Sequence, residues 1–405
     1  MKQKMDELKQ LCAEAKEELL HHIIPFWESM QDFEHGGFYG YMGQDLVVDK
    51  TYDKGCILNS RILWFFSEAY LTLGDEKLLS CADSAWTLLE ESFVDHEEGG
   101  LFWSVTYDGQ PKDMTKHTYN QAFAIYGLCS YYKASKNRKA LDLAFTLFHL
   151  IEEKMRDEKG YLEAFNRDFT PASNDKLSEN GVCAQRTMNT ILHVMEAYTN
   201  LAEVTGEEVV RERLREILTI IVNAIYNRDL CRQEVFFDLD YNSLIDLYSY
   251  GHDIEAAWLI DDATKQAYIG YLGDGMEMGV IGKMVQEMEQ QVYKEAYNGT
   301  CLPEEKEDGK VRENRVWWIQ AEAVNGFVNA WEKNPKEEKY LDAARNIWSY
   351  IREYLIDKRP GGEWFWEVDS EGKPLSEHAM ADPWKCPYHN GRMCLLLIRR
   401  EEHAS

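Results

Sequence analysis

Apolar residues recur along most of the chain with the 3.6-residue period of an α-helix, and they do so in two alternating forms. One form has a single apolar stripe and polar residues elsewhere, as in the segment 5–30. The other is apolar around most of its circumference, as in the segment 54–73. A helix with one apolar stripe lies at a surface, whereas a helix that is apolar all round is buried. The pattern therefore predicts an outer and an inner set of helices.

Twelve helices are predicted in strict alternation between the two forms. The outer helices are expected at about 5–30, 76–93, 138–155, 207–226, 275–297 and 337–356, and the inner helices at about 54–73, 118–134, 182–204, 247–269, 315–331 and 387–399. Six inner and six outer helices make a closed (α/α)6 barrel, so the predicted fold class is all-α. No low-complexity stretch or Pro/Gly/Ser-rich linker divides the chain, which is interpreted as one domain over residues 1–405.

Short segments that combine glycine with aromatic residues recur at intervals of about 60 to 75 residues. They begin at Gly36, Gly99, Gly160, Val235, Asn298 and Gly361, and the fourth and fifth copies are degenerate. Each is interpreted as a tight turn or short strand that closes one helix before a loop leads to the next. The longer segments 107–116, 157–181, 227–249, 301–314 and 366–386 are expected to be loops that cover one mouth of the barrel.

Composition and charge narrow the range of partners. The 405 residues carry a formal net charge of −27, which argues against nucleic acid or an anionic membrane as a partner, because both require a basic surface. The nine cysteines form no Cys-x-x-Cys pair, and neither a signal peptide nor a long apolar span is evident, so a reduced, cytoplasmic setting is expected. An acidic barrel of this size is expected to be a monomer.

Polar and aromatic residues are concentrated near the N-terminal ends of the inner helices. In an up-and-down barrel these ends meet at one mouth, where the helix dipoles also favour an anion. The candidates at this mouth are Asn59, Arg61, Tyr119, Asn189, His193, His252, Glu255, Trp317, Trp318, Trp384 and His389. Taken alone, the pair Trp317 and Trp318 would more often belong to the core than to a binding platform. The abundance of aromatic residues, 13% of the chain, is a weak indication of a sugar-binding cleft.

The candidate histidines differ in their local sequence. His252 and Glu255 are three residues apart on one helical face, with Gly251 as a flexible joint before them, so the carboxylate is expected to fix the imidazole tautomer and raise its pKa. His193-x-x-Glu196 repeats this spacing, whereas His389 is followed at that position by an arginine. The alternative for each histidine is a hydrogen-bonded core residue. A metal site is also conceivable, but no further ligand set stands out, and neither metal nor cofactor is expected.

Arg61 lies in an otherwise apolar helix and cannot remain buried without a partner. It is either one half of a structural ion pair or a ligand for an anion. With three histidines beside it, the second alternative suits removal of a proton next to a carbonyl, which needs a base with a pKa near 7 and stabilisation of the resulting enediolate. Epimerisation needs a second acid/base group on the opposite face. Glycoside hydrolysis would instead need a placed pair of carboxylates, and a non-catalytic sugar-binding protein is a third alternative.

Five segments, in order along the chain, resemble those of the N-acylglucosamine 2-epimerase superfamily, and within it those of the cellobiose 2-epimerases. They are residues 58–61 (LNSR), 188–198 (MNTILHVMEAY), 251–259 (GHDIEAAWL), 315–322 (RVWWIQAE) and 384–389 (WKCPYH). The resemblance implies an (α/α)6 barrel that acts without cofactor or metal. The implied reaction inverts C2 of the reducing-end glucose or mannose in β-1,4-linked disaccharides such as cellobiose and lactose.

The resemblance also implies roles for individual residues. By it, His252 and His389 remove and return the C2 proton, His193 assists opening or closure of the sugar ring, Arg61 steadies the enediolate, Trp317 and Trp384 form aromatic walls, and Tyr119, Asn189 and Glu255 make supporting polar contacts. Asn59 and Trp318 complete the candidate substrate contacts. The alternatives are a monosaccharide epimerase or aldose–ketose isomerase of the N-acylglucosamine 2-epimerase or mannose isomerase type and, less favoured, an inverting glycoside hydrolase. The preferred disaccharide, the ratio of epimerisation to isomerisation and the face served by each histidine stay open.

Overall fold

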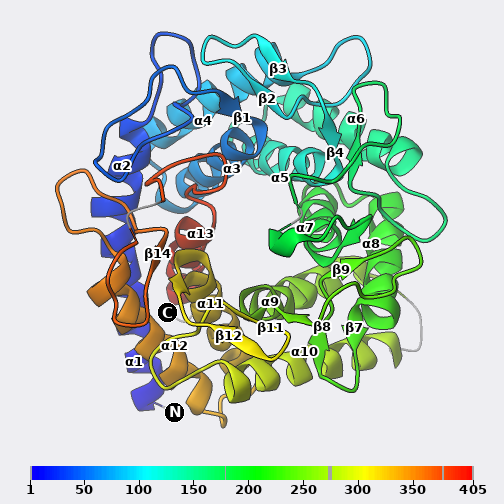
Figure 1. Ribbon diagram of the computed structural model, residues 1–405. Coiled ribbons are helices and arrows are strands. Elements are labelled where there is room, and N and C mark those ends of the chain that lie inside the picture. Colours follow the sequence, from blue (N-terminus) through cyan, green and yellow to red (C-terminus); the bar gives the residue numbers. More distant parts are fainter. Residues whose placement is uncertain (1, 178, 272–275, 376–377, 404–405) are drawn as a thin grey trace.

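The computed structural model describes residues 2–177, 179–271, 276–375 and 378–403, and its helices form two concentric rings (Figure 1). The inner ring consists of α3 (Cys56–Leu73), α5 (Thr118–Ser135), α7 (Met188–Thr205), α9 (Tyr250–Ala267), α11 (Trp317–Lys333) and α13 (His389–His403). The outer ring consists of α1 (Lys2–Glu18) with α2 (Ile24–Ser29), α4 (Glu76–Leu88), α6 (Arg138–Lys154), α8 (Glu208–Ile220), α10 (Met276–Glu295) and α12 (Lys339–Tyr350). Each inner helix contacts the next, and α13 contacts α3. The predicted (α/α)6 barrel is confirmed.

The observed helices differ from the predicted ones in two respects, namely the conformation at the end of four outer helices and the start of one inner helix. The outer helices beginning at Lys2, Glu76, Glu208 and Lys339 all run into a five-residue π-helical turn, at Leu19–Ile23, Leu89–Phe93, Ile221–Ile225 and Ile351–Leu355. The inner helix expected from residue 182 begins only at Met188, since the two residues before it form strand β6 (Arg186–Thr187). Apolar residues of this preceding segment continue the helical period, which is why the pattern alone extends the helix.

Two-residue strands precede five of the inner helices, directly or by one residue. They are β1 (Lys54–Gly55), β4 (Lys116–His117), β6, β10 (Leu247–Tyr248) and β13 (Arg315–Val316). Each pairs antiparallel with a strand beyond the following outer helix, namely β2 (Ser104–Val105), β5 (Ala164–Phe165), β9 (Phe236–Phe237), β11 (Glu305–Glu307) and β14 (Glu367–Val368). The strands β3 (Pro111–Asp113), β7 (Tyr226–Asn227), β8 (Arg232–Gln233) and β12 (Lys310–Arg312) complete short hairpins. Backbone ladders thus fix where the inner helices start.

An Asp or Asn residue follows each outer helix and closes a turn with its side chain. These residues are Asp32, Asp95, Asp157, Asn227, Asn298 and Asp357, and the Oδ1 atom of each accepts a hydrogen bond from the backbone N–H two residues later. Such side-chain-to-backbone bonds are a common way to start a turn. Six such turns confirm the six repeating units, including the fourth and fifth, in which the glycine–aromatic pattern is degenerate.

Ion pairs connect this turn to the following inner helix in the first three units, and the first two of these pairs are buried. Oδ2 of Asp32 lies 2.7 Å from Nζ of Lys54, the first residue of β1, and Oδ2 of Asp95 lies 2.9 Å from Nζ of Lys116, the first residue of β4. The third unit repeats the pair with an aspartate and an arginine, Asp157 and Arg186. Each pair therefore ties the end of an outer helix to the start of the inner helix that follows.

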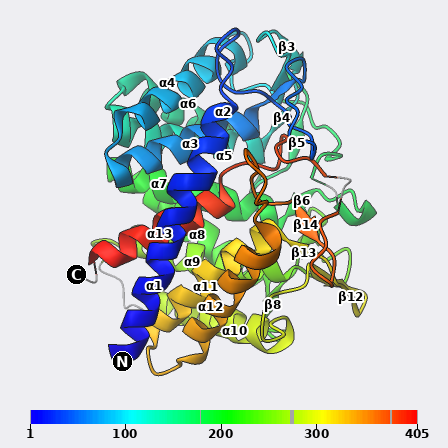
Figure 2. The same ribbon diagram turned by 90° about the vertical axis from the view of Figure 1, so that its left-hand side faces the viewer.

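The N-terminal helix closes the barrel from outside. Figure 2 shows α1 lying across α13, and the two helices are in contact. All nine cysteines are free thiols, and seven of them are buried. Among the residues that the structure describes, no helix combines the length and the apolar character that a membrane span requires.

Candidate active site

A cavity of about 930 Å³, which includes the open space at its mouth, lies over the N-terminal ends of the inner helices. Four of the five predicted loops contribute to its wall: Leu177 and Asn180 from 157–181, Val235, Phe236, Leu247 and Ser249 from 227–249, Glu305 from 301–314, and Trp366 and Trp384 from 366–386. The loop 107–116 contributes no lining residue. The size and the mixture of aromatic and polar groups are those of a small-molecule site.

Ten of the eleven candidate residues line this single cavity. They are Arg61, Tyr119, Asn189, His193, His252, Glu255, Trp317, Trp318, Trp384 and His389. The exception is Asn59, which is fully buried and donates from Nδ2 to the carbonyl oxygen of Gly55 at 2.9 Å. Asn59 therefore does not line the cavity as expected, because residues two apart on a helix point in different directions and Arg61 is the one that faces the cavity.

His193 is held by the carboxylate that the sequence spacing indicates. Its Nδ1 lies 2.9 Å from Oε2 of Glu196, one turn further along α7. The ring also packs edge-on against Tyr119 and beside Phe123. Burial lowers the pKa of His193, so the neutral imidazole prevails at neutral pH. With Nδ1–H donated to the carboxylate, the lone pair of Nε2 is left free to act as a base.

His252 does not pair with Glu255, and this sequence-based expectation is wrong. The Nδ1 atom of His252 lies 2.7 Å from Oγ of Ser249, the residue that precedes α9. The Ser249 hydroxyl is therefore hydrogen-bonded to the imidazole and makes no side-chain capping bond to the helix backbone. Burial lowers the pKa of His252 to about 3. Glu255 is drawn instead to a buried arginine, Arg392, whose Nη2 lies 2.5 Å from its Oε1.

Gly251 is not the flexible joint that the sequence indicates, since it lies inside the first turn of α9. A Cβ atom at this position would lie 2.6 Å from Cγ1 of Ile319 and 2.7 Å from the indole of Trp318. The missing side chain therefore allows α11 to approach α9 closely. As a result, the ring centroids of Trp318 and His252 are 4.7 Å apart.

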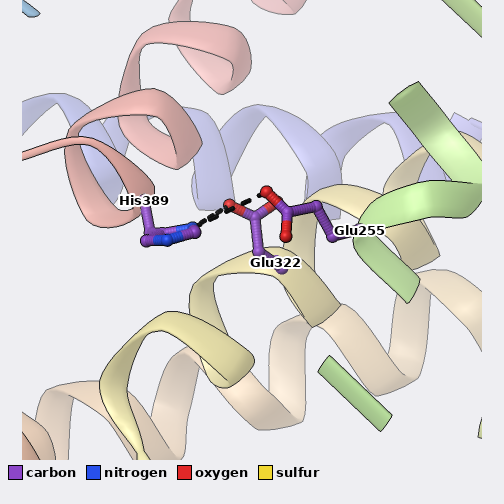
Figure 3. Close-up of side chains that lie close together, drawn as sticks. All are labelled: Glu255, Glu322 and His389. Carbon is purple, nitrogen blue, oxygen red and sulfur yellow. Dashed lines mark hydrogen bonds and ion pairs between the residues drawn. The ribbon is translucent and has the colours of Figure 1, made fainter. Parts of the chain in front are cut away.

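His389 is the first residue of α13, and its Nδ1 lies 2.8 Å from Oε1 of Glu322 and 3.8 Å from Oε1 of Glu255 (Figure 3). Its ring centroid lies 5.3 Å from that of Trp318, the same indole that contacts His252. Burial, followed by the charge of Arg392, holds the pKa of His389 well below its usual value. The two histidines thus contact the same aromatic ring inside one cavity.

Glu255, Glu322 and His389 come close enough to suggest a cation site, with ligand atoms within 4.8 Å of one another (Figure 3). The positive charge is supplied by the protein itself. Nη2 of Arg392 lies 2.5 Å from Glu255 and 2.6 Å from Glu322. The two carboxylates of this donor set are therefore already bound to a guanidinium.

Arg61 is buried at the cavity wall and makes no ion pair with any carboxylate of the described residues. Its Nη2 donates to the Tyr119 hydroxyl at 2.8 Å, and its guanidinium lies over the ring of Phe123, 4.1 Å from the centroid. The structural ion pair is thus ruled out for this part of the chain. A buried cation without a counter-charge attracts an anion, and the enediolate of a sugar is one.

Several residues of the cavity carry no signal in the sequence. They lie in loops, in short strands or in the 3-10 turn Glu179–Gly181, where the direction of a side chain does not follow the helical period. These residues are Leu177, Asn180, Val235, Phe236, Leu247, Glu305 and Trp366. Trp366 is the one of these residues that the sequence could have indicated, and its ring centroid is 4.7 Å from that of Trp317. The density of aromatic residues in the segment from Gly361 onwards could have marked it.

The chain is similar to known proteins over nearly its whole length. Residues 36–390 match the model of the family described as N-acylglucosamine 2-epimerase (GlcNAc 2-epimerase). A curated cellobiose 2-epimerase from Eubacterium cellulosolvens is 48% identical over 398 residues, covering 94% of this chain and 96% of the relative.

Two solved structures have the same architecture over their full length. A sugar epimerase from a ruminal bacterium has a TM-score of 0.93 at 45% identity, with 96% of this chain and 99% of the other covered. The cellobiose 2-epimerase of Bacillus thermoamylovorans B4167 has a TM-score of 0.92 at 44% identity, with 97% and 100% covered. The resemblance seen in the sequence is confirmed, and the chain belongs to the N-acylglucosamine 2-epimerase family.

Proposed function

We propose that the protein is a cellobiose 2-epimerase, which inverts C2 of the reducing-end glucose or mannose in β-1,4-linked disaccharides such as cellobiose and lactose. The observation that carries the proposal is that His252 and His389 line one cavity and both contact the indole of Trp318. Two acid/base groups directed at one space are what inversion of a carbon by proton removal and return requires. Relatives of 48% and 46% identity over nearly the whole chain are named cellobiose 2-epimerases.

The first step of the proposed mechanism opens the sugar ring. His193, held by Glu196, is placed to exchange a proton with the ring oxygen or the O1 hydroxyl. Opening yields an aldehyde at C1 and makes the C2 proton acidic. One imidazole then takes this proton, the electron pair of the C2–H bond forms a C1–C2 double bond, and O1 becomes anionic. The unpaired charge of Arg61 stabilises this cis-enediolate.

Return of a proton to the opposite face of C2 by the second imidazole, in its protonated form, completes the inversion, and the ring then closes. The carboxylate at Nδ1 of His389 stabilises the imidazolium that forms when this residue takes up a proton. His252 has only a hydroxyl at this atom. The two imidazoles must carry one proton between them, so kcat/KM is expected to fall on both sides of an optimum pH.

Two features favour a disaccharide over the alternatives. The cavity is also lined by Trp317 and Trp366, which contact each other, and by Trp384, and these aromatic side chains offer stacking faces for a second ring. The carboxylates of Glu255 and Glu322 come within 4.8 Å of each other and share Arg392. An inverting hydrolase needs a pair roughly 6.5–9.5 Å apart, so these two do not form one.

The test is incubation of the protein with cellobiose in heavy water, followed by NMR. The expected product has mannose at its reducing end and carries deuterium at C2. Parallel reactions with mannose and N-acetylglucosamine are expected to be slower by at least an order of magnitude. Release of free glucose would indicate hydrolysis, and retention of the C2 proton would refute the proposal.

A further inference from the structure

Arg392 lies beneath the cavity and joins three acidic residues from three different helices. Its Nη1 bonds Oε1 of Glu196 on α7, and its Nη2 bonds Glu255 on α9 at 2.5 Å and Glu322 on α11 at 2.6 Å. The residue itself belongs to α13 and is 1% exposed. Its guanidinium also lies over the ring of Tyr388, 4.1 Å from the centroid. One side chain thus ties together four of the six inner helices.

Two of these glutamates are the ones that hold histidines. Glu196 holds Nδ1 of His193, and Glu322 holds Nδ1 of His389. A continuous chain of contacts therefore runs from one imidazole to the other through a single guanidinium. Arginine suits this position because its planar fork binds several carboxylate oxygens at once and stays charged. Lysine has a point charge on a flexible stem and offers no such fork.

A second cavity, of about 600 Å³, reaches the same arginine from the other end of the barrel. Its rim consists of residues from the C-terminal halves of inner helices, Glu68, Lys133, Glu203, Asp262 and Arg399, and its floor includes Glu196 and Arg392. The Nε atom of Arg392 is buried and has no hydrogen-bond partner among the described residues. The arginine therefore separates the reactive cavity from a rear opening through which a small cation can enter.

We propose that Arg392 is the positioning residue of the active site, which fixes the carboxylates behind His193 and His389 together and so sets the tautomer and proton affinity of both imidazoles. The proposal rests on the proposed function for its kinetic readout, but not for its spectroscopic one. Arg392 touches neither the cavity nor the sugar, so it acts through the two glutamates.

The direction of the effect follows from the charges that face these groups. The neighbours of the two imidazoles and of the guanidinium are Glu196, Glu255, Glu322, Arg61, His252, Tyr119, Tyr126 and Tyr388. After burial, the charge of Arg392 contributes to the low pKa of His389, and it acts on His193 in the same direction. Removal of the guanidinium leaves the carboxylates without a cation, so the pKa of each imidazole is expected to rise.

The decisive comparison uses Arg392→Met, Arg392→Lys and the matched control Arg399→Met. Arg399 lies two turns further along the same helix and pairs with Glu68, which holds no histidine. Loss of a supporting partner of this kind typically costs roughly 10–100-fold in activity. Arg392→Met is expected to lower kcat by about 100-fold and to move the acidic limb of the pH profile upward by about one unit. Arg392→Lys is expected to lower kcat while the pKa of the acidic limb stays within a few tenths of a unit of the wild-type value. Arg399→Met is expected to leave this pKa unchanged.

Titration of the ¹⁵N-labelled histidines by NMR, without substrate, gives the readout that does not depend on catalysis. The resonances of His193 and His389, assigned with His→Gln variants, are expected to titrate at higher pH in Arg392→Met and to lose the single Nδ1–H tautomer. If the wild type fails to epimerise cellobiose but these shifts appear, the proposed function fails and the role of Arg392 stands. Unchanged titration and an unchanged tautomer in a folded Arg392→Met variant would overturn the role.

Rescue through the rear cavity completes the test. Arg392→Ala opens the floor between the two cavities, and guanidinium at millimolar concentration is expected to restore activity several-fold, whereas sodium chloride of equal ionic strength does not. The same addition is expected to leave Arg399→Ala unchanged. If the alanine and methionine variants do not fold, the lysine variant decides by its imidazole tautomers. Absence of rescue together with wild-type tautomers in Arg392→Lys would sink the proposal.

Discussion

The two walls of the cavity present the same side chain, histidine, in opposite electrostatic settings. On the wall formed by α11 and α13, His389 faces a carboxylate that is itself bound to an arginine. On the wall formed by α9, His252 faces a serine hydroxyl. A carboxylate stabilises an imidazolium, whereas a hydroxyl accommodates either the neutral or the charged ring. The difference indicates that His389 is placed to accept a proton and His252 to donate one readily.

Removal of either imidazole is the largest expected effect. His252→Ala and His389→Ala should each lower kcat for epimerisation by at least about 10³-fold, within the range that acid/base groups contribute. Each variant should still exchange the C2 proton of one epimer with heavy water, since one base remains, and the two variants should act on different epimers. Exchange is read by NMR, and circular dichroism checks the fold. Exchange of the same epimer by both variants would break the assignment of one histidine to each wall.

The partners of the two imidazoles give the next test. Glu322→Gln is expected to lower kcat by roughly 10–100-fold, because it removes the charge that supports the imidazolium of His389. Ser249→Ala is expected to cost only a few-fold, since the hydroxyl bears no charge. Both are measured as kcat and KM on cellobiose, and KM should change little in either case. Equal losses in the two variants would show that the walls are electrostatically alike.

A substitution at Gly251 can displace the indole of Trp318, which contacts both histidines. Gly251→Ala places a methyl group against Ile319 and the Trp318 indole, and overpacking of this kind typically costs 1–3 kcal/mol. Activity is expected to fall by about an order of magnitude as the indole shifts against both imidazoles, with a lower melting temperature. The control is Gly279→Ala in α10, where a methyl group meets nothing within 4 Å. There the melting temperature should rise or stay constant, as expected for alanine in a helix.

The smallest effect concerns stability in acid. Burial holds the pKa of His252 at about 3 in the folded chain, while the unfolded chain protonates this residue near pH 6.5. Between these values the unfolded state binds more protons, so stability falls as the pH drops from 6.5 towards 3, by about 1.4 kcal/mol per pH unit for each such imidazole. The melting temperature of His252→Gln should therefore decline less between pH 7 and pH 5 than that of the wild type. An identical decline would mean that His252 is already protonated in the folded protein.

The helices and their arrangement can be predicted from the sequence, because the buried face of each helix repeats with a period of 3.6 residues. The alternation of striped and wholly apolar helices gave the barrel, and the common direction of the inner helices placed ten candidate residues in one cavity. The same rule explains the error at Asn59, which lies two residues from Arg61 and so on another side of α3.

The choice of partners for the charged groups could not be predicted in this way. Glu255 shares a helical face with His252, yet it binds Arg392, which is 137 residues away in the chain. A buried carboxylate takes the strongest available cation, and the identity of that cation depends on how distant helices come together. Local spacing succeeded for His193 and Glu196 because both bond within one helix.

The buried pairs between Lys54 and Asp32 and between Lys116 and Asp95 have an evolutionary consequence. They tie the start of an inner helix to the turn that precedes it, and the cavity residues Arg61 and Tyr119 lie near the starts of these two helices, α3 and α5. Natural variation in the segment between such a turn and its helix is therefore expected to leave these two side chains in place.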